Sequence, residues 1–500
     1  NIGTHLCCVT CCLQRKPDQY RLLIRHTNMY SSSFAFFEAI WDAGVTHCFV
    51  NLGSDHPGMI DAMMVAMSMA DGYARVTGKP QCVIVHVDVG TQALGVAVHN
   101  ASSGHAPVLI FAGMSPFTQE GELRGSRTEF IHWLQDIPDQ KAILGQYCKY
   151  AAEIKTGVNI KQMVNRALQF SRTAPQGPVY LCAAREIMEA EIKPYSIKQE
   201  QWEPVELGGL SAKSASRIAK SLAGSERPLV VTGYSGRNHG IPGLLVELAD
   251  TVKALQIVDD LRTGEASKVL ATKAQTAAEE ARLQSYTAKI ERIAKAAEPF
   301  PNNTFGTGHL SKVLCSVCPE DTIWAVEAVT NTSFIHDNVR PTLPGSWINC
   351  GGGGLGWSGG GALGMKLAAD AEGKGQFVCQ IVGDGTYLFS MPSSVYWISK
   401  RYNIPILTIV LNNNGWNAPR KSYMLIHPDG EAAEATNEEM NISFNPPPDY
   451  AGIAAAAGTG DRFALKVTKS DSLKAVLRDA VAKVKGGQTT VVDCRIVTDC

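Results

Sequence analysis

The residues best suited to chemistry in this chain follow two apolar runs. Residues 377–382 are mostly apolar and end in the sequence GDGT at 383–386, and residues 405–411 are mostly apolar and end in NNNG at 412–415. A carboxylate, an amide oxygen and a backbone carbonyl are hard oxygen ligands that suit a Mg²⁺ ion holding phosphate oxygens. Glycines allow backbone N–H groups to approach a diphosphate at a helix N-terminus. The two turns therefore predict a site for Mg²⁺ and a diphosphate.

Both apolar runs are predicted to be buried strands, joined by a helix that is entered through Ser390 and Pro392. Parallel strands joined in this way bring their carboxyl ends to the same edge of a sheet, which is where open α/β sheets bind ligands. We therefore expect Asp384 and Asn413 to face each other across one crevice.

The GDG turn, the strand–helix unit and the paired asparagines together resemble the cofactor-anchoring motif of thiamine-diphosphate (ThDP) enzymes. The resemblance implies that Asp384, Asn413 and the backbone carbonyl of Gly415 bind Mg²⁺. The other residues of the two turns that it implies as cofactor contacts are Gly383, Gly385, Thr386 and Asn412.

A glycine-rich segment at 351–364 continues directly into the apolar residues 365–369, which predicts a loop entering a helix rather than a flexible linker. The segment resembles the part of ThDP enzymes in which a large apolar side chain props the cofactor in a bent shape. On this resemblance Leu355 is the prop, and the carbonyl of Gly353 accepts a hydrogen bond from the 4′-amino group of the cofactor. The bend holds that amino group against the reactive carbon, so that it can act as an intramolecular base.

The rest of the chain alternates strands and helices, which predicts an α/β fold with doubly wound parallel sheets. Residues 33–41 are predicted to form an amphipathic helix closed by Gly44. The predicted strands outside the two turns are residues 45–52, 81–87, 108–112, 178–182 and 321–327. Residues 70–79 (ADGYARVTGK) resemble a segment of the acetolactate synthase and 2-oxo acid decarboxylase branch of the ThDP enzymes.

The resemblance implies a three-domain ThDP-enzyme architecture. It assigns residues 1–195 to a pyrimidine-binding domain, 196–300 to a central Rossmann-like domain and 301–500 to a diphosphate-binding domain. Residues 227–236 are predicted to be a strand running into a glycine-rich turn, followed by a helix at 244–255. Residues 259–297 have a helical pattern without a strand, so the central domain is expected to be incomplete. Because it contains no G-x-G-x-x-G motif, we do not expect FAD.

One departure from the family pattern concerns catalysis. ThDP enzymes of this branch carry a glutamate that activates the aminopyrimidine ring, and the corresponding position here is Met63. Residues 59–75 are predicted to be two helices run together, where a doubly wound sheet needs a strand between them. We expect that a strand and the glutamate-bearing turn belong to a segment of the protein absent from this sequence. The alternatives are an enzyme that works without the carboxylate and an inactive one.

Several polar residues lie around the predicted strand end that faces the cleft, namely His86, Asp88, Gln92, His99 and His105. One of them could transfer protons, although a structural role is favoured for each taken alone. Arg420 follows the second turn and could bind a substrate carboxylate through two hydrogen bonds, or could be a solvated surface residue.

Composition narrows the class of protein and its compartment. The net charge of −1 gives no electrostatic reason to expect a nucleic acid or a membrane surface as partner, and no apolar run approaches the ~20 residues that span a bilayer. Several of the fourteen cysteines, Cys48 and Cys82 among them, lie in apolar runs as core residues, which favours a reducing compartment. The cysteine doublets within residues 7–12 and the pair Cys315 and Cys318 lack a matching second pair at metal-ligand spacing, so incidental cysteines are favoured over a metal site.

We therefore expect a cytoplasmic protein, with a mitochondrial one as the alternative because basic residues at 15–25 could belong to a transit peptide. The resemblance implies ThDP- and Mg²⁺-dependent decarboxylation of a 2-oxo acid, with carboligation of the acyl unit to an aldehyde or a second 2-oxo acid. It also implies a homodimer or homotetramer, because the family builds each active site from two subunits. The alternatives are a ThDP-dependent lyase acting on a 2-hydroxyacyl or oxalyl thioester of the coenzyme A type, and a ThDP-binding protein without catalytic activity.

Overall fold

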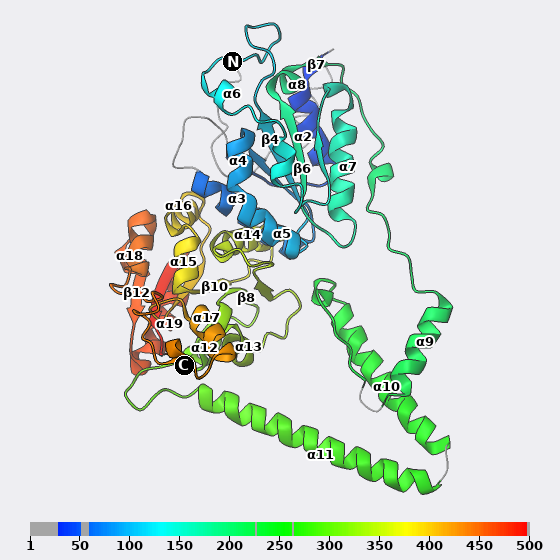
Figure 1. Ribbon diagram of the computed structural model, residues 1–500, viewed down its shortest axis with the longest axis vertical. Coiled ribbons are helices and arrows are strands. Elements are labelled where there is room, and N and C mark those ends of the chain that lie inside the picture. Colours follow the sequence, from blue (N-terminus) through cyan, green and yellow to red (C-terminus); the bar gives the residue numbers. More distant parts are fainter. Residues whose placement is uncertain (1–28, 52–59, 226–227, 263–264, 498–500) are drawn as a thin grey trace.

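The computed structural model describes residues 29–51, 60–225, 228–262 and 265–497. Two parallel sheets, each covered by helices on both faces, make up most of this part of the chain (Figure 1). The first sheet lies at the top of the view in blue to teal, and the second lies below it in yellow to red. This arrangement confirms the predicted α/β fold with parallel sheets.

The first sheet has five strands in the order β2-β3-β4-β6-β5, all parallel. The short strands β1 and β7, from the two ends of this part of the chain, pair with each other in antiparallel orientation. The strands are β1 (Tyr30–Ser31), β2 (Cys48–Asn51), β3 (Gln81–Val85), β4 (Val108–Met114), β5 (Ala151–Glu153), β6 (Val179–Ala184) and β7 (Glu191–Ile192). The predicted strands at 81–87, 108–112 and 178–182 are therefore present, with ends that differ by a few residues.

Helices cover the two faces of the first sheet because alternate strand residues point to opposite sides. On one face α2 and α7 pack against residues such as Leu109 and Leu181. On the other face α3 and α5 pack against residues such as Val83 and Ile110. The helices of this part are α2 (Ser32–Asp42), α3 (Ile60–Thr77), α4 (Val87–Ala93), α5 (Gly95–Ser103), α6 (Ile131–Leu134), α7 (Ile160–Arg172) and α8 (Arg185–Glu189).

The prediction of two helices over residues 59–75 is wrong in one respect. The described residues form one continuous helix, α3, which runs from Ile60 to Thr77. Its residues 64–74 are almost entirely buried, so the helix lies in the interior and not on the surface. A buried helix is apolar on most of its sides, so the sequence pattern does not show whether such a segment forms one helix or two.

The second sheet has six parallel strands in the order β12-β13-β11-β10-β8-β9. The strands are β8 (Ile323–Glu327), β9 (Trp347–Asn349), β10 (Val378–Gly383), β11 (Leu407–Asn412), β12 (Ala464–Val467) and β13 (Thr490–Arg495). The chain leaves β8 toward β9 and then returns to the other side of β8 as β10. The topological switch point therefore lies between β8 and β10, and ligands bind in open α/β sheets beside such a point.

The helices of the second sheet also occupy both faces. On the outer face α12 and α19 pack against Cys379 and Ile381 of β10, and on the inner face α14 packs against Val378 and Val382. The helices are α12 (Thr307–Val317), α13 (Thr332–Val339), α14 (Trp357–Ala371), α15 (Asp384–Phe389), α16 (Pro392–Tyr402), α17 (Asn417–Ile426), α18 (Tyr450–Ala454) and α19 (Ser470–Lys485).

Helices α3 and α14 join the two sheets into one body. Buried residues of both helices and of both sheets form a single hydrophobic cluster. The helices approach so closely that a Cβ on Gly72 would lie 2.3 Å from the backbone oxygen of Gly361, and one on Gly364 would lie 2.0 Å from that of Met69. Glycine is required at these positions because any side chain would push the two backbones apart.

The middle of the chain differs from the expected Rossmann-like domain. Residues 228–232 have no regular secondary structure and residues 233–234 form a bend, so the predicted strand is absent from the described residues. Three helices make up most of this region instead: α9 (Ala212–Ala223), α10 (Ile241–Arg262) and α11 (Glu265–Ala296). The predicted helix at 244–255 is thus part of α10. Figure 1 shows these three helices in green to one side of the sheets, with α11 running back below them.

Within the described ranges, no helix is both long enough and apolar enough to cross a bilayer.

Candidate active site

Asp384 lies at the carboxyl end of β10 and begins α15, beside the switch point of the second sheet. Its side chain is buried, with 3% exposure. Oδ1 accepts a hydrogen bond from the N–H of Gly385 at 2.9 Å, and Oδ2 accepts from the N–H groups of Asn413 at 3.1 Å and Gly415 at 3.2 Å. The turn after β11 therefore wraps around this carboxylate, as the two sequence motifs predict.

The amide of Asn413 supplies the clearest indication of a cation site. One of its terminal atoms lies 2.9 Å from the oxygen of Gly415 and 3.1 Å from each carboxylate oxygen of Asp384. If that atom is nitrogen, it donates hydrogen bonds to these oxygens. If it is oxygen, three different groups present oxygen atoms to one point, which is the arrangement that a divalent cation requires. In the structure this atom is the amide oxygen, so the donor set fits Mg²⁺ as it stands, and only a half-turn of the amide would replace the cation arrangement with hydrogen bonds.

Burial raises the pKa of Asp384 to about 6, although the N–H groups that surround it act in the opposite direction. A buried carboxylate is costly unless its charge is compensated. A divalent cation held by Asp384, Asn413 and Gly415 would provide that compensation.

The first residues of α15 can receive a diphosphate. Gly383 precedes the helix, and Thr386 is buried one residue beyond Gly385. A Cβ on Gly385 would lie 2.3 Å from the ring of Trp416, so a side chain there would collide with the indole. Because position 385 is a glycine, the indole of Trp416 can lie directly against the turn, and the backbone N–H groups of the turn stay close to Asp384.

The glycine-rich loop before α14 lies beside this site. Gly353 is exposed, Leu355 is half-buried, and Gly356 takes a left-handed conformation with φ of 100°. A Cβ on Gly356 would lie 2.3 Å from the backbone oxygen of Phe389, the last residue of α15. The loop that carries Gly353 and Leu355 therefore packs against the helix that begins with Asp384.

Glu327, which the sequence reasoning did not single out, fixes the end of this loop. It is the last residue of β8 and is 5% exposed. Its carboxylate accepts hydrogen bonds from the N–H groups of Gly356 at 3.0 Å, Trp357 at 3.3 Å and Ser358 at 2.7 Å. Burial raises the pKa of Glu327, against the effect of these donors. The only sequence signal was an acidic residue at the end of a predicted strand.

The polar residues of the first sheet fall into two groups. His86 lies just before α4, and burial lowers its pKa, while Asp88 lies in the first turn of α4 and accepts a hydrogen bond from Gln92 at 3.3 Å. His99 lies in α5 instead, where Nε2 accepts a hydrogen bond from the N–H of Gly353 at 3.1 Å. In the described part of the chain, no hydrogen bond joins His86, Asp88 or Gln92 to the Asp384 site.

Three other residues predicted from the sequence to lie in the site, His105, Arg420 and Asn412, make hydrogen bonds within the chain. His105 binds the backbone oxygen of Gln176 through its ring at 3.2 Å. Arg420 is half-buried and donates from Nε to Asn437 at 2.7 Å and from Nη2 to the backbone oxygen of Ala435, and its contact with a substrate stays a prediction.

Asn412, a predicted cofactor contact, also makes hydrogen bonds within the chain. Its side chain donates to Asp493 at 2.9 Å and accepts from Arg495 at 2.9 Å, which turns it toward β13 and away from Asp384. Its contact with a cofactor through the backbone remains a prediction.

The candidate metal-binding cysteines lie elsewhere. The doublets within residues 7–12 are outside the described residues, and Cys315 and Cys318 lie at the end of α12 as free thiols. Among the described His, Cys, Asp and Glu side chains, no three converge as a metal site.

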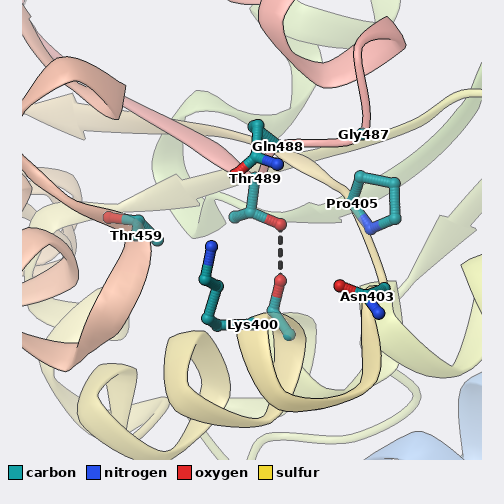
Figure 2. Close-up of a pocket in the computed structure, with 8 residues that line it drawn as sticks. Lys400, Asn403, Pro405, Thr459, Gly487, Gln488 and Thr489 are labelled. Atoms are coloured by element: carbon teal, nitrogen blue, oxygen red, sulfur yellow. Dashed lines mark hydrogen bonds between the residues drawn. The ribbon is translucent and has the colours of Figure 1, made fainter.

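Two cavities lie at opposite ends of the second sheet. The cavity in Figure 2 lies where β11 and β13 begin, includes Lys400, Pro405 and Thr489 in its lining and has a volume of about 20 Å³, which is too small for a cofactor. The other has a volume of about 340 Å³ and lies beyond the carboxyl ends of the strands. Its polar lining includes Asn412, Asn414, Lys466, Asp493 and Arg495. Of these two cavities, the second lies at the same edge of the sheet as Asp384.

Comparisons with known proteins agree with this fold. Residues 32–143 match the family described as thiamine pyrophosphate enzyme, N-terminal TPP binding domain, and residues 328–494 match the C-terminal TPP binding domain of the same family. Together these matches cover more than half of the chain.

Individual relatives are more distant. Benzoylformate decarboxylase of Pseudomonas aeruginosa is 22% identical over 537 residues, covering 90% of this chain and 96% of the relative. Acetolactate synthase of Bacillus subtilis is 22% identical over 233 residues, covering 44% of this chain and 38% of the relative. The solved structure of the thiamine diphosphate-dependent 4-hydroxybenzoylformate decarboxylase of Rhodococcus jostii RHA1 has a TM-score of 0.69 at 16% identity. It covers 94% of this chain and 100% of that structure.

Fold, site and comparisons thus define an enzyme of the thiamine-diphosphate class. The chain belongs to the family of thiamine-diphosphate-dependent enzymes that includes the 2-oxo acid decarboxylases and the acetolactate synthases.

Proposed function

We propose that this protein is a ThDP- and Mg²⁺-dependent enzyme that decarboxylates a 2-oxo acid and transfers the resulting acyl unit to an aldehyde or a second 2-oxo acid. The observation that carries the proposal is the convergence of Asp384, Asn413 and Gly415 on one point beside the start of α15. The domain boundaries near residues 195 and 300 and the roles of Gly353 and Leu355 are part of the same proposal.

Each part of the site would have one task. Asp384, Asn413 and the carbonyl of Gly415 would hold the cation, and the N–H groups after Gly383 would hold the diphosphate. Leu355 and Gly353 would orient the ring system. When bound, ThDP supplies a thiazolium ring that accepts the electron pair released as the 2-oxo acid loses CO₂.

We further propose that the protein acts as a homodimer or homotetramer. His86 and Asp88 lie at the carboxyl end of the first sheet, and no hydrogen bond in the described residues joins them to Asp384 of the same chain. A second subunit could supply the missing side of the cleft. We expect Asp384→Ala and His86→Ala each to be inactive alone, and mixing the two variants tests this arrangement. Activity recovered on mixing supports shared sites, and no recovery contradicts them.

The position of the catalytic glutamate bears on the chemistry. Met63, which occupies the family position, lies in the first turn of α3. The alignment with benzoylformate decarboxylase has 537 positions, although it covers only 90% of this 500-residue chain, so the relative contains residues without a counterpart here. This supports the expectation that the complete protein carries a further internal segment. An intact mass equal to that of the 500 residues would contradict it.

The decisive experiment measures CO₂ release from a panel of 2-oxo acids with ThDP and Mg²⁺, with the products identified by mass. Release that requires both additions supports the proposal, and a new carbon–carbon bond in the product establishes carboligation. Turnover of a 2-hydroxyacyl or oxalyl thioester in place of every 2-oxo acid would instead indicate the lyase.

A second function is favoured by one observation, the methionine at position 63. A ThDP-binding protein without catalytic activity would retain the Asp384 site and lack the activating carboxylate. Cofactor binding without release of CO₂ from any 2-oxo acid would support this second function. Restoration of turnover by Met63→Glu would show that only the carboxylate is missing.

A further inference from the structure

We propose that Asn100 is a positioning residue for the cofactor, because it holds the glycine-rich loop that carries Gly353. Residues 351–356 of this loop connect β9 of the second sheet to α14, whereas Asn100 lies on α5, which packs against the first sheet. The inference rests on the proposed function, since the role of the Gly353 carbonyl is part of that proposal.

Asn100 binds both backbone groups of one loop residue. Its Nδ2 donates to the carbonyl oxygen of Gly354 at 2.8 Å, and its Oδ1 accepts from the N–H of Gly354 at 3.0 Å. Asn100 is fully buried. A buried amide that uses its donor and its acceptor on the same residue fixes both the distance and the orientation of that part of the backbone.

The loop can approach α5 only because positions 352 and 354 are glycines. A Cβ on Gly354 would lie 2.3 Å from Cγ1 of Val96, and a Cβ on Gly352 would lie 2.6 Å from Nε2 of His99. A Cβ on Gly353, by contrast, would meet nothing within 4 Å. One face of the loop is therefore closed by α5, and the residue between the two contacts faces open space.

A second side chain, from α3, holds the end of β9, where the loop begins. Arg75 of α3 donates from Nη1 to the backbone oxygen of Asn349 at 2.8 Å, and Asp71 fixes Arg75 through an ion pair of 2.5 Å. Both side chains of this ion pair are buried. With the start of the loop held by Arg75, its centre by Asn100 and its end by Glu327, the orientation of the Gly353 peptide is determined by its surroundings.

Loss of Asn100 should separate cofactor binding from turnover. The cation and the diphosphate would still be held at Asp384 and Gly385, so ThDP should still bind. The carbonyl of Gly353 would no longer be held in place, and a displacement of about 1 Å at a reacting geometry can cost about 10²-fold in rate. The expected signature is a large fall in kcat with little change in KM.

The test compares Asn100→Ala with the unmodified protein and with Asn165→Ala, a matched variant of another fully buried asparagine, on α7. Hydrogen exchange of residues 349–356 is measured first without cofactor. ThDP affinity, the near-ultraviolet circular dichroism of the bound cofactor, kcat and KM are then measured. We expect faster exchange at Gly353 and Gly354, an altered cofactor spectrum and a fall in kcat of about 10²-fold for Asn100→Ala alone.

Unchanged exchange in Asn100→Ala would overturn the inference, as would faster exchange with an unchanged cofactor spectrum and unchanged kcat. If the unmodified protein binds no ThDP, the proposed function fails, while the exchange measurement still reports whether Asn100 holds the loop.

If Asn100→Ala does not fold, Gly354→Ala provides the same test, because its Cβ forces the loop away from α5. Adding Val96→Ala removes the tightest contact of that Cβ, at 2.3 Å, and leaves only those with the Asn100 amide at 3.0 and 3.1 Å, so it should restore part of the exchange protection and of kcat. No recovery in the double variant would count against the inference.

Discussion

The indole Nε1 of Trp357 donates a hydrogen bond to Oδ2 of Asp71 at 3.0 Å, inside the protein and across 286 residues of sequence. Trp357 is the first residue of α14, and Asp71 lies within α3. This bond fixes the angular position of the two helices that join the sheets. It also links the end of the cofactor loop to the helix that holds Arg75.

Replacing Trp357 with phenylalanine tests this bond while keeping a ring in the core. The variant removes one buried donor from Asp71, which should cost about 1–3 kcal/mol in the free energy of unfolding. Urea unfolding gives the value. A double variant with Asp71→Asn provides the control, because the cost of Trp357→Phe should change once the carboxylate is absent. Identical costs in both backgrounds would contradict a direct interaction.

Gly72→Ala should destabilise the packing of α3 against α14, the two helices that lie between the sheets. The new Cβ would lie 2.3 Å from the backbone oxygen of Gly361, and a backbone cannot move aside as a flexible side chain can. We expect a loss of about 1–3 kcal/mol from overpacking. Gly95→Ala is the matched control, since a Cβ there meets nothing within 4 Å in the helix α5. Equal melting temperatures for the two variants would show that the helices can separate without cost.

Asp384→Ala should abolish the Mg²⁺ dependence of ThDP binding. The variant removes the only carboxylate among the proposed cation ligands, so the change in affinity on adding Mg²⁺ should disappear. Fluorescence titration with ThDP, with and without Mg²⁺, measures this. Asp493→Asn, at the carboxyl end of the neighbouring strand β13, should keep the Mg²⁺ effect. Full activity of Asp384→Ala would refute the metal assignment.

Glu327→Ala should loosen the end of the cofactor loop. Three buried N–H groups would lose their acceptor, and losing hydrogen bonds to a charged group should cost about 3 kcal/mol in the free energy of unfolding. Glu327→Gln keeps an oxygen in place and should cost about half as much. Denaturant unfolding of both variants at neutral pH checks this order, and a Gln variant as unstable as the Ala variant would contradict the capping role.

His86 should make stability depend on pH below neutrality. Burial lowers its pKa from 6.5 in the folded state, so the unfolded chain binds a proton more readily. The contribution of the neutral ring is therefore present above pH 6.5 and is lost as the pH falls through the lower, folded-state pKa. Between pH 7 and pH 5 the unmodified protein should lose more stability than His86→Gln. Parallel losses in urea unfolding would assign the pH dependence to other groups.

The sequence by itself determined the fold class and the positions of the cofactor motifs. The strands at 377–382 and 405–411, the turns that follow them and the helix after the glycine-rich loop are all local features, encoded by runs of apolar residues and by glycines at turns. Connection through a helix is enough to bring two parallel strand ends together. For that reason Asp384 and Asn413 could be paired before their distance was known.

The tertiary structure decided what surrounds these motifs. Three contacts illustrate this: Asn100 binds the glycine-rich loop, Trp357 binds Asp71, and Glu327 accepts hydrogen bonds at the start of α14. These contacts join segments 29 to 286 residues apart. Neither periodicity nor turn chemistry predicts which side chains meet over such distances. The strand predicted at residues 227–236 failed for the same reason. An apolar segment becomes a strand only where a neighbouring strand accepts its hydrogen bonds, and the described middle of the chain provides none.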